Sequence, residues 1–485
     1  MKITSACYVV ILLFWGCTSE QLNYEQLNRT LLSYAQVGSA HLTEEIAEVN
    51  SPYFDAVFQR PDFPSALDSA FPGDDIQQRI DALASIGGGK LIIQKGNYLT
   101  GRLVLKSNIH LYLEEGAVVE FKGNIEDFLP VVFTRNEGIE LYSLGACIYA
   151  SDVKNIAITG KGKIVGPGEG TVRRRTMTHD VIENLVFADT PIENRIYDGK
   201  TADYIFPPAL IAPINCEHVF IEGISLERSA FWNIVPTYCD NVVIRGVNIN
   251  SIGIQRGDGI DVESSRNVLI EYCTFNTGDD CIALKAGRGH DGLRVNRPTE
   301  NVVVRYCLAE QGHGGFTVGS ETAGQVRNVY VHDCAFDGTD VGIRFKTRRP
   351  RGGGGNSMLF ENIRMNVVYS ALRWDMLGQA LHVGKQADRN VQVAVNPLTP
   401  RFSDIRMNNI LIEDAADCIK IEGIPESVLE DVEITHVVGR GDRFLVARDA
   451  RDLRIENSEF QVKDPKIDTI NVKELLQRKV RLLAL

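Results

Sequence analysis

Three aspartates recur at about the length of one coil of a solenoid. Residues 276–280 read Asn-Thr-Gly-Asp-Asp, and Asp258 precedes Asp279 by 21 residues and Asp280 by 22. If a coil of a parallel β-helix takes a little over 20 residues, positions one coil apart stack at the strand spacing of roughly 4.8 Å. Crowded carboxylates raise the proton affinity of at least one member, so one can donate a proton while another accepts one. This spacing predicts a glycosidase active site.

A pair of cations follows at Arg344-Phe345-Lys346. Residues i and i+2 of a strand share a face, so both cations are expected to project together while Phe345 enters the core. A guanidinium can grip a carboxylate with two hydrogen bonds, and an ammonium adds a point charge. The pair therefore indicates a site for an anionic ligand.

Charge is unevenly distributed along the chain. The net charge is −12, which argues against a nucleic-acid-binding protein, yet basic residues cluster at 285–297 and 344–351. Local positive charge on an acidic protein indicates a small or polymeric anionic partner held at one place. For residues 348–351, which precede four consecutive glycines, a solvated basic loop is an open alternative.

A short motif, an Asn or Asp followed by an apolar-x-apolar strand, repeats along the chain. Successive starts from residue 218 to residue 328 differ by 23, 26, 34 and 27. Short alternating strands with polar or Gly turns and no intervening helical pattern predict an all-β fold, a parallel β-helix. An antiparallel sandwich is the alternative, although its period would be about 8 to 12 residues. The motif starts at Asn155, His218, Asn241, Asn267, Asn301, Asn328, Asn362, Asp431 and Asp452.

The first residues concern export. Lys2 precedes an apolar stretch from Ala6 to Gly16 that is too short to span a bilayer, which is typical of a secretory signal. Cys17 follows it in a context that resembles a bacterial lipoprotein processing site. We expect residues 1–16 to be the signal, and lipidated Cys17 to attach a periplasmic or outer-membrane lipoprotein to the membrane. Ordinary secretion, with Cys17 a bystander, is the alternative.

The remaining boundaries follow from the repeat. Residues 17–70 are expected to be a tether, 71–470 the β-helix domain and 471–485 a C-terminal cap or tail. Residues 75–86 have a helical apolar pattern just ahead of Gly87-Gly88-Gly89, so a short helix there is expected to cap the open N-terminal end of the stack.

Eight cysteines remain after Cys7 and Cys17. Cys216 and Cys239 precede motif strands, while three others follow theirs at equivalent positions. Equivalent coil positions favour buried thiols that stack in ladders. Disulfides are the alternative, because the protein is expected to be exported. No Cys-x-x-Cys or His-x-x-x-His spacing is present, so we expect neither a metal nor a cofactor.

The stretch from Phe206 to Gly378 resembles glycoside hydrolase family 28, the polygalacturonase family of pectin-degrading, right-handed β-helix enzymes. Weaker similarity extends upstream through the glycines at 87–89. The last four of the five matching pieces are motifs in the family's order. The pieces are residues 239–246 (Cys-Asp-Asn-Val-Val-Ile-Arg-Gly), Asp258-Gly259-Ile260-Asp261, residues 277–283 (Thr-Gly-Asp-Asp-Cys-Ile-Ala), Gly312-His313-Gly314 and Arg344-Phe345-Lys346.

The resemblance implies hydrolysis of α-linked galacturonate with inversion. Asp279 would be the general acid, while Asp258 and Asp280 would position and deprotonate water. An inverting pair stands roughly 6.5 to 9.5 Å apart, which one coil step plus a lateral offset would give. Gly278 is expected to permit a sharp bend that turns both adjacent aspartates into one cleft.

Further roles are implied by the same resemblance. His313 matches the family's active-site histidine, and Arg344 and Lys346 would bind the galacturonate carboxylate beside the scissile bond. Asp261, at i+3 from Asp258, is expected to face away and serve structure.

This chain departs from the family pattern at two places. Typical endo-polygalacturonases read Asn-Thr-Asp where this chain reads Arg256-Gly257-Asp258. The lengthened segment 285–298, together with the gap from 158 to 218 that includes Arg173-Arg174-Arg175, is expected to close one end of the groove. We therefore predict an exo-acting enzyme that removes terminal galacturonate from an oligosaccharide or a rhamnogalacturonan. The cations expected to contact this substrate are Arg344, Lys346, Arg256 and Lys285.

Two other classes of protein stay open. A pectate lyase shares the β-helix but uses calcium and a basic residue for β-elimination, which leaves an unsaturated product. A non-catalytic glycan-binding solenoid would bind the glycan, and Asp279→Asn would not affect it.

Overall fold

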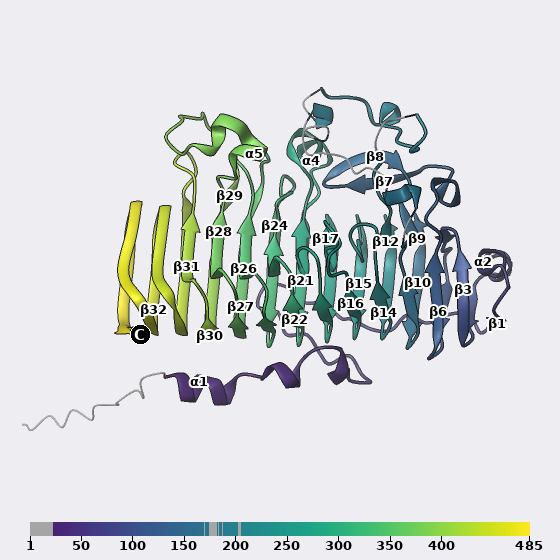
Figure 1. Cartoon of the computed structure of the whole chain (residues 1–485), viewed down its shortest axis with the longest axis horizontal. Helices are drawn as coiled ribbons and strands as arrows, with labels where there is room; N and C mark the ends of the chain where they lie inside the picture. The colour runs from purple at the N-terminus through teal and green to yellow at the C-terminus, as the bar shows by residue number, and fades with distance from the viewer. Residues whose placement is uncertain (1–22, 169, 174–181, 183, 187, 202–204) are drawn as a thin grey trace, which may run out of the picture.

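The chain is a right-handed parallel β-helix, as the repeat and the family resemblance predict. The computed structural model describes residues 23–168, 170–173, 182, 184–186, 188–201 and 205–485. The strands stack coil upon coil along the long axis of the molecule, and nearly all of their pairings are parallel (Figure 1). Each coil contributes one strand to each of up to three faces, so residues one coil apart lie side by side.

The repeated motif forms the first face. Val242, Val268, Val302 and Val329 stand in register on four successive strands and point into the core. The strands of this face are β1 (Leu67–Ala70), β2 (Gly89–Ile93), β5 (Ile109–Leu113), β10 (Lys154–Gly160), β13 (Glu217–Glu222), β15 (Asp240–Arg245), β18 (Arg266–Glu271), β21 (Thr299–Arg305), β24 (Val326–His332), β27 (Gly354–Asn366), β30 (Ile405–Asp414) and the start of β32 (Leu429–Ala484).

The Asn of the motif has a backbone role. Asn155, Asn267, Asn301 and Asn328 have φ between 54° and 59°, the left-handed region that Asn tolerates better than other side chains. Their amides also stack along the face, because Asn301 donates to Asn267 at 3.0 Å and Asn328 donates to Asn301 at 2.9 Å. The repeat is therefore a turn residue that starts each strand.

The second face is built from short strands. It comprises β3 (Gly96–Thr100), β6 (Ala117–Phe121), β11 (Lys163–Val165), β14 (Ser225–Glu227), β16 (Asn248–Asn250), β19 (Thr274–Asn276), β22 (Leu308–Gln311) and β25 (Ala335–Asp337).

The third face carries the residues singled out from the sequence. It runs from β4 (Leu103–Val104), β9 (Ala146–Ser151) and β12 (Ala209–Ile214) through β17 (Ile260–Glu263), β20 (Ile282–Lys285), β23 (Gly314–Val318), β26 (Val341–Lys346), β28 (Ser370–Asp375) and β31 (Asp417–Glu422).

A helix closes the N-terminal end of the stack, as predicted. Helix α2 (Ile76–Ser85) is capped at its N-terminus by Asp75, whose side chain accepts a hydrogen bond from Gln78 N at 3.1 Å. Ile76, Ile80 and Leu83 are buried against the first coils. At the other end, residues 471–484 continue β32 as the last strands of the stack (Figure 1).

Residues 23–66 do not form a loose tether, so that prediction is wrong for this part of the chain. The segment begins with α1 (Tyr24–Thr30) and runs along the solenoid (Figure 1), and Val49 and Phe58 pack against the first face. The side chains of Arg245, Arg305 and Arg364 donate hydrogen bonds to its carbonyl oxygens. We call residues 23–66 the strap.

Residues 1–22 lie outside the described part of the chain, and with them the predicted signal and Cys17. Among the described residues, no helix is both long enough and apolar enough to cross a membrane.

The cysteines of the described chain are unpaired and buried, as their positions predict. Cys307 lies between Cys273 and Cys334 of the neighbouring coils, and burial together with these two thiols holds its pKa well above the usual range. The thiols therefore serve as small apolar side chains of the core.

Two insertions project from the same edge of the β-helix. One contains the antiparallel hairpin β7 (Val132–Asn136) and β8 (Ile139–Ser143) with α4 (Gly289–Val295), and the other contains α5 (Ala380–Val383) and the 3-10 helix η6 (Gly384–Ala387). Figure 1 shows α5 apart from α4, β7 and β8 along the upper edge of the stack.

Candidate active site

Three carboxylates converge where adjacent coils enter the third face. Asp258 lies two residues ahead of β17, and Asp280 lies two residues ahead of β20. Because Ile260 of β17 pairs with Ile282 of β20, 22 residues later, Asp258 and Asp280 are also one coil apart. One oxygen from each of Asp258, Asp279 and Asp280 lies within 4.8 Å of the others. These oxygens are closer than the 6.5 to 9.5 Å predicted for an inverting pair, so one coil step accounts for their separation without a lateral offset.

The three acids differ in exposure. Asp279 keeps 24% of its side chain exposed, whereas Asp258 keeps 4% and Asp280 none. Asp279 is therefore the member of the cluster that can touch a bound molecule most directly, and Asp258 and Asp280 lie beneath it.

Asp280 is held ionised by cations two coils away. Lys346 Nζ lies 2.5 Å from its Oδ2, Arg344 Nη1 lies 3.7 Å from its Oδ1, and Thr317 donates to Oδ1 at 3.0 Å. Burial alone would favour the neutral acid, but the charges of Lys346, Arg344 and Lys285 outweigh it and lower the pKa of Asp280 below its usual range. Arg344 and Lys346 thus project together from β26, as the strand alternation predicts.

Asp258 has the opposite tendency. Burial, reinforced by the neighbouring charges of Asp261 and Asp279, raises the pKa of Asp258 well above its usual range. Its Oδ1 is buried and has no hydrogen-bond partner among the described residues. Burial and crowding thus favour the protonated form of Asp258.

His313 completes the exposed rim of the cluster. Its Nδ1 lies 3.1 Å from Asp279 Oδ1, and its backbone N–H donates to Asp279 O at 2.9 Å. The hydrogen bond to Asp279 raises the pKa of His313 despite partial burial. The imidazolium form is therefore favoured next to Asp279.

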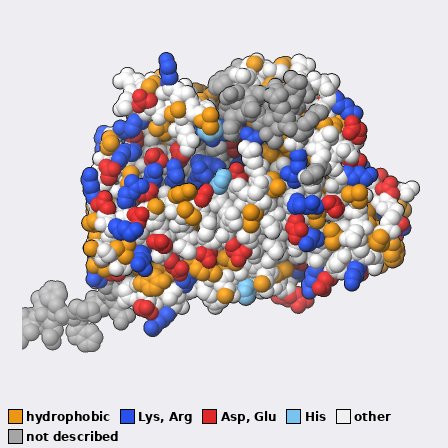
Figure 2. Space-filling view, viewed as in Figure 1, with side chains coloured by type: hydrophobic (Ala, Val, Ile, Leu, Met, Phe, Trp, Pro, Cys, Tyr) orange, Lys and Arg blue, Asp and Glu red, His pale blue; other side chains and the backbone are white. Residues whose placement is uncertain are grey.

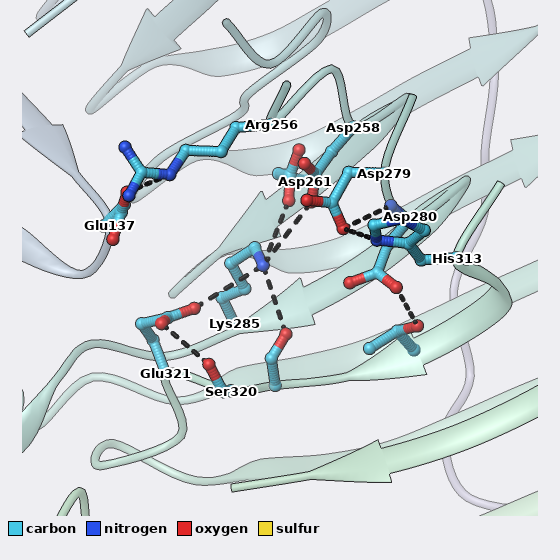
Figure 3. A network of polar contacts seen from close by, with 12 residues as sticks. Glu137, Arg256, Asp258, Asp261, Asp279, Asp280, Lys285, His313, Ser320 and Glu321 are labelled. Carbon is cyan, nitrogen blue, oxygen red and sulfur yellow. Dashed lines mark hydrogen bonds and ion pairs between the residues drawn. The ribbon is translucent and has the colours of Figure 1, made fainter. Parts of the chain in front are cut away.

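Lys285 lies beneath the acids, so the prediction that it contacts the substrate is wrong. Its Nζ stands 3.8 Å from Asp258, 3.4 Å from Asp261 and 3.5 Å from Glu321 (Figure 3). Burial disfavours its charge, but Asp261 and Glu321 more than compensate and raise the pKa of Lys285 well above its usual range. Lys285 is a buried counter-charge for the cluster.

The side chain of Asp261 is directed toward the site, so the prediction that it faces away is wrong. Figure 3 shows its carboxylate beside Asp258, directed toward Lys285. The count of three residues misleads because Asp258 precedes β17 while Asp261 lies within it, so strand alternation does not relate the two side chains. Burial raises the pKa of Asp261 well above its usual range.

Arg256 belongs to the side wall of the site. Its Nε lies 3.0 Å from Glu137 Oε1 (Figure 3), and Glu137 Oε2 is also 3.0 Å from Arg288. Arg288 in turn lies 2.8 Å from Glu321. A chain of buried ion pairs therefore connects Arg256 with the counter-charge under the acids, and contact of Arg256 with a substrate stays a prediction.

Gly278 serves close approach rather than an unusual backbone angle. Its φ is not positive, but a Cβ there would lie 2.2 Å from the carbonyl oxygen of Ile254. Only glycine lets the segment before Asp279 pass this close to the preceding coil.

One end of the site is bordered by a packed unit that we call the end wall, namely β7, β8, α4 and residues 188–201. Arg195 of this unit pairs with Asp291 of α4 at 2.9 Å, and Asp291 accepts a hydrogen bond from Glu140 N at 2.9 Å. Tyr142 of β8 pairs with Ile196. Residues 285–298 and part of 158–218, the two segments predicted to lie here, thus meet at the hairpin of β7 and β8. The sequence analysis does not predict this hairpin. Arg174 and Arg175 lie outside the described residues.

The three aspartates are also close enough to share a metal ion. Lys346 and Lys285 already contact two of them, however, and supply positive charge at this position. The absence of a metal requirement therefore stays a prediction, and a chelator tests it.

The chain is similar to known proteins in sequence and in fold. The chain is 26% identical over 371 residues to a probable polygalacturonase of Vitis vinifera, a match that covers 75% of this chain and 69% of that protein. It is 26% identical over 367 residues to an exo-poly-alpha-D-galacturonosidase of Dickeya chrysanthemi, covering 70% and 59%. The crystal structure of a hyperthermoactive exopolygalacturonase from Thermotoga maritima superposes with a TM-score of 0.70 at 27% identity, covering 88% of this chain and 94% of that one. The sequence model of glycosyl hydrolases family 28 matches residues 85–437, so the chain belongs to this family and is a glycoside hydrolase.

Proposed function

We propose that this enzyme removes terminal galacturonate from α-linked galacturonate chains, with inversion at the anomeric carbon. The observation that carries the proposal is the contact of the acid cluster with the cation pair: Lys346 and Arg344 lie against Asp280, one of the three converging carboxylates. A uronate carboxylate bound by this pair would place the adjacent glycosidic bond over the acids.

Asp279 is the proposed general acid. Protonation of the leaving oxygen requires contact with the substrate, and Asp279 is the exposed member of the cluster. Asp280, held ionised by Lys346, is the proposed base that deprotonates water, and Asp258 helps to position that water. His313, which contacts Asp279, is proposed to contact the substrate.

Exo-action is supported by the end wall. Its ion pairs are buried, including Arg288 with Glu137 and Arg195 with Asp291. A wall fixed by such contacts would stop a polymer from running through the site, so only a chain end would reach Asp279. The exo-acting relatives in Dickeya and Thermotoga are in line with this reading.

Product analysis tests the proposal. The enzyme is incubated with polygalacturonate and with a panel of galacturonate and rhamnogalacturonate oligomers, and products are separated during the first few percent of reaction. Monogalacturonate from the first time point is expected. An early mixture of longer oligomers would contradict exo-action.

The same digestions test the lyase alternative. β-Elimination requires calcium, and it leaves an unsaturated sugar that absorbs ultraviolet light. We expect no such absorbance, and we expect the rate to be unchanged by a chelator. Ultraviolet absorbance of the product, or a loss of rate with the chelator, would contradict hydrolysis by carboxylates alone.

We also propose that the protein is exported and attached to a membrane through a lipid on Cys17. The support is Lys2 followed by the short apolar stretch that ends at Gly16. Labelled fatty acid should be incorporated into the wild type and not into Cys17→Ser. Equal labelling of both would contradict lipidation, and secretion without a lipid is the alternative.

A further inference from the structure

The two ends of the stack differ in what covers them. Helix α2 lies over the first coils, whereas no helix or strand of the described chain covers the last coil, residues 463–485. This coil is joined to the one before it by the ion pairs of Arg478 with Glu456 and of Arg481 with Glu459. We call residues 463–485 the terminal coil.

The terminal coil exposes apolar side chains. Single exposed apolar side chains are ordinary on a protein surface, whereas a patch of them marks a surface that contacts a partner or a membrane. An uncovered solenoid end also needs a polar outer surface to stay soluble on its own. Five apolar side chains of the terminal coil each keep at least 36% of their surface exposed, namely Ile467, Ile470, Leu476, Leu483 and Leu485.

The terminal coil is basic although the protein is acidic. It carries six Lys and Arg residues against three Asp and Glu residues, in a chain of net charge −12. Lys466, Lys473 and Lys479 are exposed, and their ammonium groups form no ion pair with a described residue. Figure 2 shows Lys, Arg and hydrophobic side chains along this end of the molecule, on the left of the view. Basic and apolar side chains together suit the interface of an anionic lipid bilayer.

The described chain also begins near this end. Leu27 of α1 packs against Leu411 and Val438, and Figure 1 shows α1 beneath the C-terminal half of the stack. Cys17 precedes Asn23 by six residues, which span about 20 Å when fully extended. A membrane that held a lipid on Cys17 would therefore lie close to the terminal coil.

Charge selects among the surfaces and partners that could meet here. The strap is the other surface close to α1, but residues 23–66 carry six acids against two bases, so anionic headgroups would repel it. A second copy of this chain, stacked end to end, would bring two basic terminal coils together, and these would repel each other. An anionic bilayer attracts the terminal coil and has neither conflict.

We propose that the terminal coil docks on an anionic phospholipid surface, so that the β-helix stands end-on. The inference goes beyond the proposed hydrolysis, and it rests on the proposed attachment only for the membrane that lies nearby. Third-face register gives five coil steps from Ile282 of β20 to Leu445 of β32, or about 24 Å. The acid cluster would thus stand clear of the headgroups, and the groove would stay open to a polysaccharide.

Sedimentation with lipid vesicles tests the inference. The protein is the mature chain, residues 17–485, with Cys17→Ser, so that neither a signal nor a lipid contributes to binding. Vesicles of phosphatidylcholine with and without phosphatidylglycerol are compared. One variant combines Lys466→Gln, Lys473→Gln and Lys479→Gln. The matched control combines three exposed lysines of the N-terminal coils, Lys95→Gln, Lys154→Gln and Lys161→Gln.

The unsubstituted terminal coil is expected to bind the anionic vesicles, to release them as salt is raised, and to ignore the neutral ones. A lysine near an anionic surface contributes about fivefold to partition, so loss of all three should weaken binding by about 10²-fold. The control variant should bind like the unsubstituted chain, and thermal unfolding checks that both variants are folded. Equal binding to both kinds of vesicle, or unchanged binding without the three lysines, would overturn the inference.

A fluorophore sensitive to its surroundings reads the orientation. Attached at Thr469→Cys of the terminal coil, it should shift to the blue when anionic vesicles are added, whereas at Glu44→Cys of the strap it should not. A shift at the strap alone, or an end-to-end dimer seen by ultracentrifugation without lipid, would overturn the inference. Neither activity nor lipidation enters these measurements, so failure of the proposed hydrolysis or of the lipid on Cys17 would be seen separately.

Discussion

Lys346 Nζ lies 2.5 Å from Asp280 Oδ2, although 66 residues separate the two in the chain. The contact keeps a fully buried carboxylate ionised at the base of the groove. It also links the residues proposed to bind the substrate carboxylate with those proposed to activate water.

Replacing Lys346 should therefore shift the acid limb of the pH profile. The pKa of Asp280 is lowered in the folded protein, so the base is ionised over most of the pH range in the wild type. In Lys346→Met the pKa rises, and activity should disappear at a pH about one to three units higher on the acid side. The profile of kcat with pH measures this shift.

The same contact affects stability with a defined sign. A depressed carboxyl pKa contributes stability above the unfolded value of about 3.9 that is lost as pH falls through the folded value. Lys346→Met should lack this contribution at neutral pH. The control is Lys463→Met, since Lys463 is exposed and pairs with Asp442 at the surface. An acid limb that stays in place in Lys346→Met would contradict the assignment.

Asp279→Asn should show that Asp279 acts as the general acid and not as the base. With an oligogalacturonate, whose leaving group needs a proton, kcat should fall by about 10² to 10⁴. With a nitrophenyl galacturonide, whose leaving group needs none, the loss should be much smaller. Asp280→Asn should lose activity on both substrates.

The control for this comparison is Asp468→Asn, at an exposed aspartate paired with Arg448. Equal losses of kcat on the two substrates in Asp279→Asn would refute its role as the acid. Far-ultraviolet circular dichroism checks that all three variants keep the β-helix.

His313 should titrate above its ordinary pKa. Its hydrogen bond to Asp279 favours the imidazolium, so the associated stability is present below about 6.5 and is lost as pH rises through the raised pKa. Proton NMR on the wild type, with His313→Gln to assign the signal, gives the value. In Asp279→Asn the pKa should return toward 6.5, and an unchanged value would show that the contact does not form in solution.

Lys285→Met should destabilise the fold as well as the site. Removing one partner of a buried ionic cluster costs about 3 to 5 kcal/mol, here because Asp258, Asp261 and Glu321 would lose their shared counter-charge. The raised pKa of Lys285 means that this stability is present below about 10.4 and lost as pH rises through the folded value. Urea unfolding at pH 7 measures the loss, and a change below 1 kcal/mol would contradict the role of Lys285 as counter-charge.

Sequence reasoning worked where one residue type recurred at the coil period. The Asn at the start of each strand predicted the stack because it marks a left-handed turn, and Asp258 and Asp280 were placed together by the same register. Arg344 and Lys346 were oriented correctly because they lie within one strand. Each of these inferences depends on local geometry or on a single coil step.

Contacts between distant loops could not be predicted in this way. Arg256 contacts Glu137 because the hairpin of β7 and β8 folds back over the site. The number of residues between Arg256 and Glu137 in the sequence does not predict this contact. The strap was missed for a similar reason, since Val49 and Phe58 find their apolar partners on coils far along the chain. A weak signal existed in Arg245 and Arg305, which follow the repeated motif directly and grip the strap.

The most direct test of the account is time-resolved proton NMR of trigalacturonate digestion in the presence of a chelator. Free monogalacturonate should appear first as its β-anomer, before mutarotation, with no signal from an unsaturated sugar. Release of the α-anomer, as the close spacing of the carboxylates would give if one acted as a nucleophile, would contradict the account, and so would an unsaturated product or a loss of activity with the chelator.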